Sequence, residues 1–121
     1  MMKAYDRLEW DYLEAMMGKL GFAVRWIKTG MAMVRSVSFS VLFNGKSLDD
    51  FKPSRGLRQG DPSSPYLFLL AAEGLSCLLK AGAGVRGITV APNAPSVNHL
   101  LFADDRLLFF EANDDSATRI D

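Results

Sequence analysis

The sequence predicts an α+β fold in which helices pack on one face of antiparallel hairpins. Apolar residues recur at helical spacing over residues 9–34 and then alternate with polar residues up to Asn44-Gly45. A strand-like apolar run surrounds the adjacent pair Asp104-Asp105. Because the hairpins and helices come in blocks and not as repeated strand–helix–strand units, the order argues against a parallel sheet. The length of 121 residues fits one domain.

Two helices are predicted at the start of the chain. The first covers residues 9–20 and ends at Gly21, and the second carries the stripe Val24, Ile27, Met31 and Val34. A hairpin follows, because alternation over residues 37–43 ends in Asn-Gly, the strongest short hairpin signal. Its return strand is expected over residues 46–52.

Residues 53–65 read as a loop, and a third long helix is expected to follow it. Ser64 is its predicted N-cap, Pro65 its first helical residue and Lys80 its approximate end. Residues 87–91 form a short strand candidate. Two more strands, 97–103 and 106–111, are expected around an Asp104-Asp105 turn, with residues 112–121 frayed.

Bulk composition excludes several classes of protein. Basic and acidic residues number 14 each, so overall charge does not indicate a nucleic-acid partner. Cys77 is the single cysteine, which excludes a disulfide within the chain and favours a small core residue. No signal peptide or membrane-spanning stretch is apparent, so we expect an intracellular protein, with nucleus and cytoplasm both open.

The pair Asp104-Asp105 lies inside the apolar run Leu100 to Phe110 and needs a physical explanation. Two adjacent carboxylates repel each other and are costly to bury. A tight turn that exposes both to water is one explanation. A divalent cation that neutralises them is the other, and it requires support from elsewhere in the chain.

Three segments together resemble a known family. The segment Ser54 to Phe68 contains Arg-Gly-Leu-Arg-Gln-Gly-Asp-Pro, His99 to Asp105 contains Phe-Ala-Asp-Asp, and Lys3 to Trp10 begins Lys-Ala-Tyr-Asp. In this order they resemble the second, third and first palm motifs of the reverse transcriptases of non-LTR (LINE-type) retrotransposons, in wording common to plant elements. The resemblance covers nearly all of residues 1–121. It implies a partial polymerase palm, with the fingers and thumb largely outside these residues.

The resemblance implies an RNA-directed DNA polymerase that transfers a nucleotide from a dNTP to a primer 3′-hydroxyl on an RNA template. Two Mg²⁺ ions, with Mn²⁺ as an alternative, would serve this chemistry. Asp104 and Asp105 would be catalytic metal ligands, and Phe102 and Ala103 would pack beneath them near the primer end.

Further roles follow from the second and first motifs. Tyr5 resembles the ring that excludes a ribonucleotide 2′-hydroxyl, and Gln59 and Gly60 resemble the loop that contacts the incoming nucleotide. Arg55 and Arg58 would contact template or phosphate. We expect Asp61 to brace its loop instead of binding metal. His99 is expected to be structural.

The match also leaves a gap. Aligning Lys3 to Asp6 with the end of the first motif places that motif's metal-binding aspartate before Met1. We therefore expect this 121-residue chain alone to be catalytically incomplete. Arg106 stands where the family has a small residue, and its guanidinium could pair with Asp105. A non-catalytic relic or nucleic-acid-associating fragment is the alternative, and a group II intron maturase fragment is a weaker one.

Overall fold

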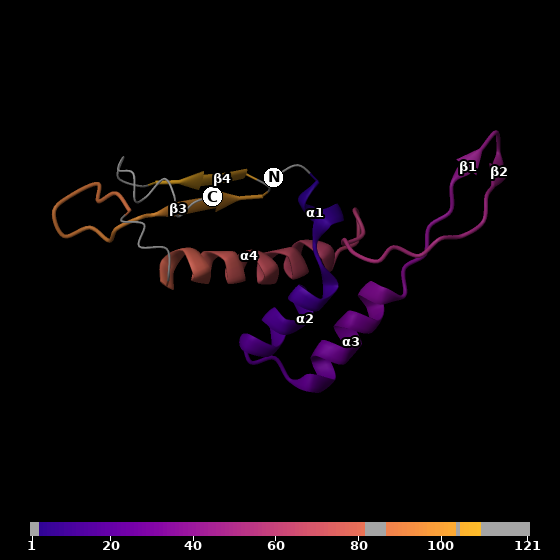
Figure 1. Ribbon diagram of the computed structural model, residues 1–121, viewed down its shortest axis with the longest axis horizontal. Coiled ribbons are helices and arrows are strands. Elements are labelled where there is room, and N and C mark those ends of the chain that lie inside the picture. Colours follow the sequence, from indigo (N-terminus) through magenta and orange to yellow (C-terminus); the bar gives the residue numbers. More distant parts are fainter. Residues whose placement is uncertain (1–2, 82–86, 104, 110–121) are drawn as a thin grey trace. The chain divides into compact units, whose positions relative to one another are not determined.

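The computed structural model describes residues 3–81, 87–103 and 105–109 (Figure 1). Its contacts divide the chain into two compact units, and the division falls inside a long helix. The first unit comprises residues 3–71, and the second contains residue 72 onward. Each unit is described by itself. Together they combine helices with small antiparallel sheets, as the α+β prediction requires.

Three helices open the first unit. These are α1 (Ala4–Arg7), α2 (Trp10–Lys19) and α3 (Val24–Arg35). The predictions of α2 and α3 are confirmed, and Gly21 separates them at φ +84°, a backbone angle that glycine adopts without strain. The single turn of α1 was not predicted, because four residues are too few to show a helical period.

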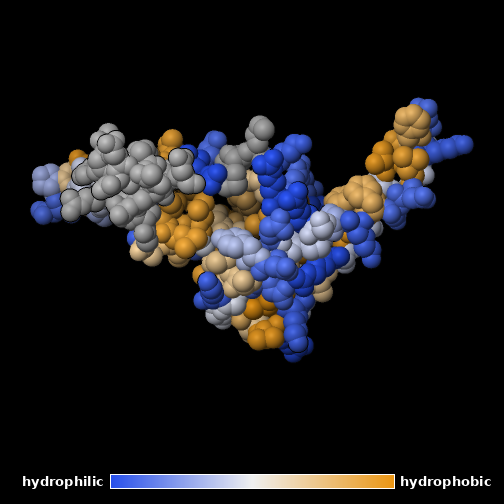
Figure 2. Space-filling model, viewed as in Figure 1, coloured by the Kyte–Doolittle hydropathy of each residue, from blue (hydrophilic) through white to orange (hydrophobic). Residues whose placement is uncertain are grey.

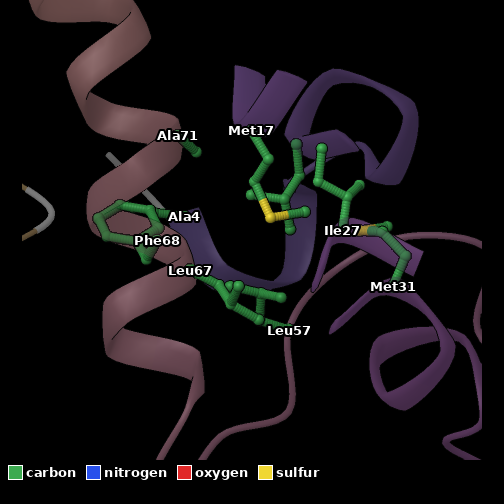
Figure 3. Close-up of a cluster of buried hydrophobic side chains, with 9 residues drawn as sticks. Ala4, Met17, Ile27, Met31, Leu57, Leu67, Phe68 and Ala71 are labelled. Carbon is green, nitrogen blue, oxygen red and sulfur yellow. The ribbon is translucent and has the colours of Figure 1, made fainter. Parts of the chain in front are cut away.

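The core of the first unit lies between α2, α3 and the start of α4 (Ser64–Ala81) (Figure 3). Leu13 and Met17 are completely buried and Met31 is 1% exposed. These residues lie in the two helices that the sequence predicted at the start of the chain. The loop contributes Leu57, and α4 contributes Leu67, Phe68 and Ala71. Burial of each large side chain is worth about 1.5–3 kcal/mol.

Helix α4 begins one residue earlier than predicted. Ser64 is its first helical residue and not its N-cap, and the Ser63 carbonyl accepts the amide hydrogen of Leu67 at 3.1 Å. Ser64 is 3% exposed. Cys77, predicted as a core residue, is exposed on this helix. The sequence was misleading there because α4 is apolar on several faces, so its pattern did not identify the buried one.

The Asn-Gly hairpin is confirmed as β1 (Leu42–Phe43) and β2 (Lys46–Ser47), with Asn44 and Gly45 at φ +47° and +76°. A further bridge pairs Phe39 with Phe51. Between this bridge and the Leu42–Ser47 pair lie two residues on the first strand, 40 and 41, but three on the return strand, 48 to 50. The extra residue makes a bulge in the return strand. Figure 2 shows hydrophobic surface on this hairpin, where Leu42 and Phe43 are 75% and 64% exposed.

The second unit contains the rest of α4 and the antiparallel hairpin of β3 (His99–Phe102) and β4 (Asp105–Leu108). Phe102 pairs with Asp105, so Asp105 is the first residue of β4. The prediction of an Asp104-Asp105 turn was therefore wrong by one residue. Ala103, the residue after β3, has φ +51°. The strand predicted over residues 87–91 is reduced to a bridge between Ile88 and Val97.

Within the described residues, no helix has the length and apolar character needed to cross a membrane. The expected fraying of residues 112–121 lies outside the described residues.

Candidate functional site

The loop that carries the second motif is hydrogen-bonded to the segment that carries the first. The amide of Gly56 donates to the Leu8 carbonyl, and the amide of Leu57 donates to the Tyr5 carbonyl, each at 2.8 Å. The indole Nε1 of Trp10 donates to the Gly56 carbonyl, also at 2.8 Å. Residues about 50 positions apart are thus connected through backbone groups, which places Tyr5 beside the loop.

Only glycine fits at position 56. Its φ is +89°, and a Cβ there would lie 2.9 Å from the Asp6 carbonyl oxygen. The sequence presents this glycine as part of a motif. The structure adds that the backbone of α1 occupies the space that a side chain would need.

A pocket of about 450 Å³ brings together three of the predicted nucleotide-binding residues, Tyr5, Gln59 and Gly60. Asp61, Ser64 and Pro65 complete its lining. Gln59 Nε2 is 3.5 Å from Asp6 Oδ1, at the limit of a hydrogen bond, so its amide is only weakly held. Gly60 has φ +82° and no atom within 4 Å of an added Cβ, so the space beside its backbone is open.

The ring of Tyr5 is held by Phe68 of α4. The two ring centroids are 4.9 Å apart and the planes differ by 11°, which is a stacked arrangement. Phe68 is 9% exposed and belongs to the core. The sequence reasoning missed this partner, although Phe68 lies within the quoted second motif. Stacking gives the half-buried Tyr5 ring a defined plane at the pocket wall.

Asp61 braces the loop, as predicted. Its Oδ1 accepts hydrogen bonds from the Ser63 hydroxyl at 2.6 Å and from the Ser63 amide at 2.8 Å. These bonds lower the pKa of Asp61, the hydroxyl bond most, and the Arg58 guanidinium lowers it further, whereas desolvation opposes them. The carboxylate is therefore engaged within its own turn.

Arg55 and Arg58 line a second pocket of about 620 Å³ in the same unit, whose wall includes Phe39, Phe51 and Leu67. Arg55 forms an exposed ion pair with Glu9 at 3.3 Å. Exposed pairs contribute little to stability, so Arg55 can exchange this partner for another anion at low cost.

The remaining predicted site residues belong to the second unit. Asp104 lies outside the described residues. Phe102 is 82% exposed, and Ala103 is also exposed, so neither packs beneath the turn as expected. Asp105 shares a face of the hairpin with Phe102, its register partner. Arg106 follows Asp105 on the strand and therefore points to the opposite face.

That geometry separates the Arg106 guanidinium from the Asp105 carboxylate, and within the described hairpin no ion pair joins them. The exposed carboxylate of Asp105 offers the oxygen ligands that Mg²⁺ and Mn²⁺ prefer. The described part of the chain contains no group of three or more His, Cys, Asp or Glu side chains able to hold a metal. The magnesium site therefore stays a prediction.

Comparison with known proteins gives a consistent result. Residues 1–120 match the family described as reverse transcriptase (RNA-dependent DNA polymerase). An uncharacterised mitochondrial protein of Arabidopsis thaliana is 53% identical over 72 residues, which are 55% of this chain and 59% of that protein.

Two retrotransposon proteins are also similar. The retrovirus-related Pol polyprotein from type-2 retrotransposable element R2DM of Drosophila melanogaster is 40% identical over 68 residues, 56% of this chain and 6% of the polyprotein. The Pol polyprotein from type-1 element R2 of Popillia japonica is 43% identical over 60 residues, 50% of this chain and 8% of the polyprotein. The aligned segments therefore span less than two thirds of each of these relatives.

Proposed function

The chain belongs to the reverse transcriptase (RNA-dependent DNA polymerase) family, and we propose that it is part of a polymerase palm that takes a dNTP, a DNA primer and an RNA template. The reaction is transfer of a nucleotidyl group to the primer 3′-hydroxyl. The observation that carries this proposal is the pocket that joins Tyr5, Gln59 and Gly60. Its volume lies within the usual range for small-molecule sites, about 300–1,000 Å³.

Each of the three residues contributes differently to binding a nucleotide. The Tyr5 ring, stacked on Phe68, forms a rigid wall against which an added 2′-hydroxyl would collide. The open space at Gly60 lets a ligand approach the backbone. The amide of Gln59 is weakly held and retains donors and an acceptor for a base or sugar.

Other residues have supporting roles in this proposal. Arg55 and Arg58 would contact the template phosphates. Asp105, together with Asp104, would hold a divalent cation, which would supply positive charge for the transfer reaction. Phe102 and Ala103, exposed beside Asp105, would face the primer end.

The pocket can be tested with a matched pair of glycines. Gly60 and Gly45 have similar φ angles, +82° and +76°, and neither has an atom within 4 Å of an added Cβ. Valine at either position should therefore cost similar stability, about 1–2 kcal/mol. We expect only Gly60→Val to weaken binding of dTTP, by about tenfold or more, because its side chain fills the pocket.

Isothermal titration of dTTP into the chain bound to a poly(rA)/oligo(dT) duplex with Mg²⁺ measures this difference. Equal dTTP affinities for the two variants would contradict the proposed site. Loss of binding by both variants would show that the effect arises from backbone strain and not from the pocket.

A separate measurement tests whether the 121-residue chain is active by itself. On poly(rA)/oligo(dT) with Mg²⁺ the proposed transfer should depend on Asp105, so we expect Asp105→Asn to abolish primer extension, because loss of a metal-binding carboxylate should cost several orders of magnitude in rate. Extension that persists in Asp105→Asn would contradict this role. Absence of extension by the wild-type chain would instead support the alternative of a non-catalytic relic.

We also propose that the chain derives from a non-LTR (LINE-type) retrotransposon. Similarity to Pol polyproteins of R2 elements supports a non-LTR origin over a group II intron maturase. An intracellular location follows from that reading, since its templates are intracellular RNAs.

A further inference from the structure

Three side chains of the second unit form a continuous hydrogen-bond chain that no motif explains. Ser76 Oγ lies 2.8 Å from His99 Nε2, and His99 Nδ1 lies 2.6 Å from Asn98 Oδ1. Asn98 Nδ2 donates to the Leu79 carbonyl at 2.8 Å. This hydrogen-bond network starts at Ser76 on α4, runs through His99 at the start of β3 and Asn98 just before it, and returns to α4 at Leu79. The start of β3 lies beside this part of the helix (Figure 1).

The bond to Leu79 assigns the hydrogens in this network. Because Asn98 uses its NH₂ group to reach the carbonyl, the atom that faces His99 is its oxygen, which only accepts. His99 Nδ1 must therefore carry a hydrogen. In the neutral ring Nε2 then has a free lone pair, which accepts the hydroxyl hydrogen of Ser76.

The hydrogen bond of Ser76 matters for stability because its hydroxyl is buried. Ser76 is only 7% exposed, and a buried hydroxyl without a partner is costly. His99 and Leu101 are half-buried, whereas Leu100 and Phe102, which alternate with them, are exposed. The network therefore tethers one face of β3 to α4.

That tether decides which face of the hairpin carries the acidic residue. His99 pairs with Leu108 and Leu101 with Arg106 on the tethered face, so Phe102 and Asp105 share the opposite, open face. A shift of β3 by one residue would reverse both faces. Apolar contacts alone would not prevent such a shift, because Leu100 and Leu101 are adjacent and either could face α4. The hydrogen bond to Ser76 can be made only by His99, so a shift would break it.

We propose that Ser76, Asn98 and His99 are positioning residues that hold the hairpin in the register that presents Asp105 on its open face. Only the role of Asp105 as a metal ligand rests on the proposed function. The hydrogen bonds of Ser76, Asn98 and His99 can be tested without any nucleotide, so an experiment can contradict one proposal and leave the other standing.

The single histidine of the chain makes the test direct. Nitrogen-15 spectra of the imidazole in the full 121-residue chain, at about pH 8 where a free ring is neutral, report which nitrogen carries the hydrogen. We expect Nδ1–H in the wild type, and a change toward Nε2–H in Asn98→Leu. A wild-type ring with hydrogen on Nε2 would overturn the proposal.

Amide hydrogen exchange measures the effect on the hairpin. We expect Ser76→Ala to lower protection of the β3–β4 amides about tenfold, the value of one lost hydrogen bond. Ser76→Thr, which keeps the hydroxyl, should restore it, and Cys77→Ala, the exposed neighbour, should have no effect. Unchanged protection in Ser76→Ala, or failure of threonine to rescue it, would contradict the proposal.

Amides of α2 in the same samples show whether the first unit remains folded. If Ser76→Ala lowers amide protection in α2 as well, the variant is unfolded as a whole. The tautomer of His99 in the wild type and the protection of β3–β4 in Ser76→Thr then test the proposal.

Discussion

Alanine at position 56 is expected to lower the free energy of unfolding by about 3 kcal/mol and to separate the two motif segments. The φ of +89° alone costs an alanine about 1–2 kcal/mol. The added Cβ would also lie 2.9 Å from the Asp6 carbonyl oxygen and 3.1 Å from its Cα. Because both neighbours are backbone atoms, no side-chain rotation relieves the collision, and the hydrogen bonds around Gly56 must lengthen.

The matched control is Gly45→Ala, which has a φ of +76° and no atom within 4 Å of the new Cβ. It should lose only the conformational part, about 1–2 kcal/mol. Urea unfolding followed by tryptophan fluorescence measures both variants. The emission of Trp10 should also change most in Gly56→Ala, since its indole donates to the Gly56 carbonyl. Equal losses in the two variants would mean that the close approach to Asp6 carries no energetic weight.

Replacing Leu13 with alanine is the second large effect that we expect, a loss of about 3–4 kcal/mol. Leu13 is completely buried and lies in the core beside Met17 and Met31. Removal of a buried leucine costs the transfer free energy of the lost atoms and leaves a cavity, together about 2–5 kcal/mol. For a small domain that is a large share of a total of about 5–15 kcal/mol.

Leu69→Ala is the control for this change, because Leu69 is 63% exposed on α4 within the same unit. Its loss should stay within about 0.5 kcal/mol. Both tryptophans, Trp10 and Trp26, belong to the first unit and report its unfolding. A loss below about 1 kcal/mol in Leu13→Ala would show that the core collapses around the missing side chain or is not formed.

Much of the local structure could be predicted from the sequence. The stripes that end at Gly21 and continue through Met31 determined α2 and α3, because a helical period needs only neighbours along the chain. Asn44-Gly45 determined the first hairpin for the same reason. The bulge in its return strand was not predictable, since it depends on how Phe39 and Phe51 pair across the hairpin.

The aspartate hairpin shows where local reasoning failed. The sequence predicts one turn that contains both Asp104 and Asp105, but the register makes Asp105 a strand residue opposite Phe102. A shift of one residue is invisible in an apolar run such as Leu100-Leu101-Phe102, where either face could be buried. The contacts of His99 resolve that ambiguity.

By itself, the sequence determined the family and the main helices and hairpins, because short motifs and periodic patterns are properties of neighbouring residues. Only the tertiary structure decided that Gly56 must approach Asp6, that Phe68 holds the Tyr5 ring, and that His99 ties β3 to α4. The physical reason is the same in each case. These contacts join residues 23 to 63 positions apart, and their energy depends on distances of 3 to 5 Å that only the folded chain establishes.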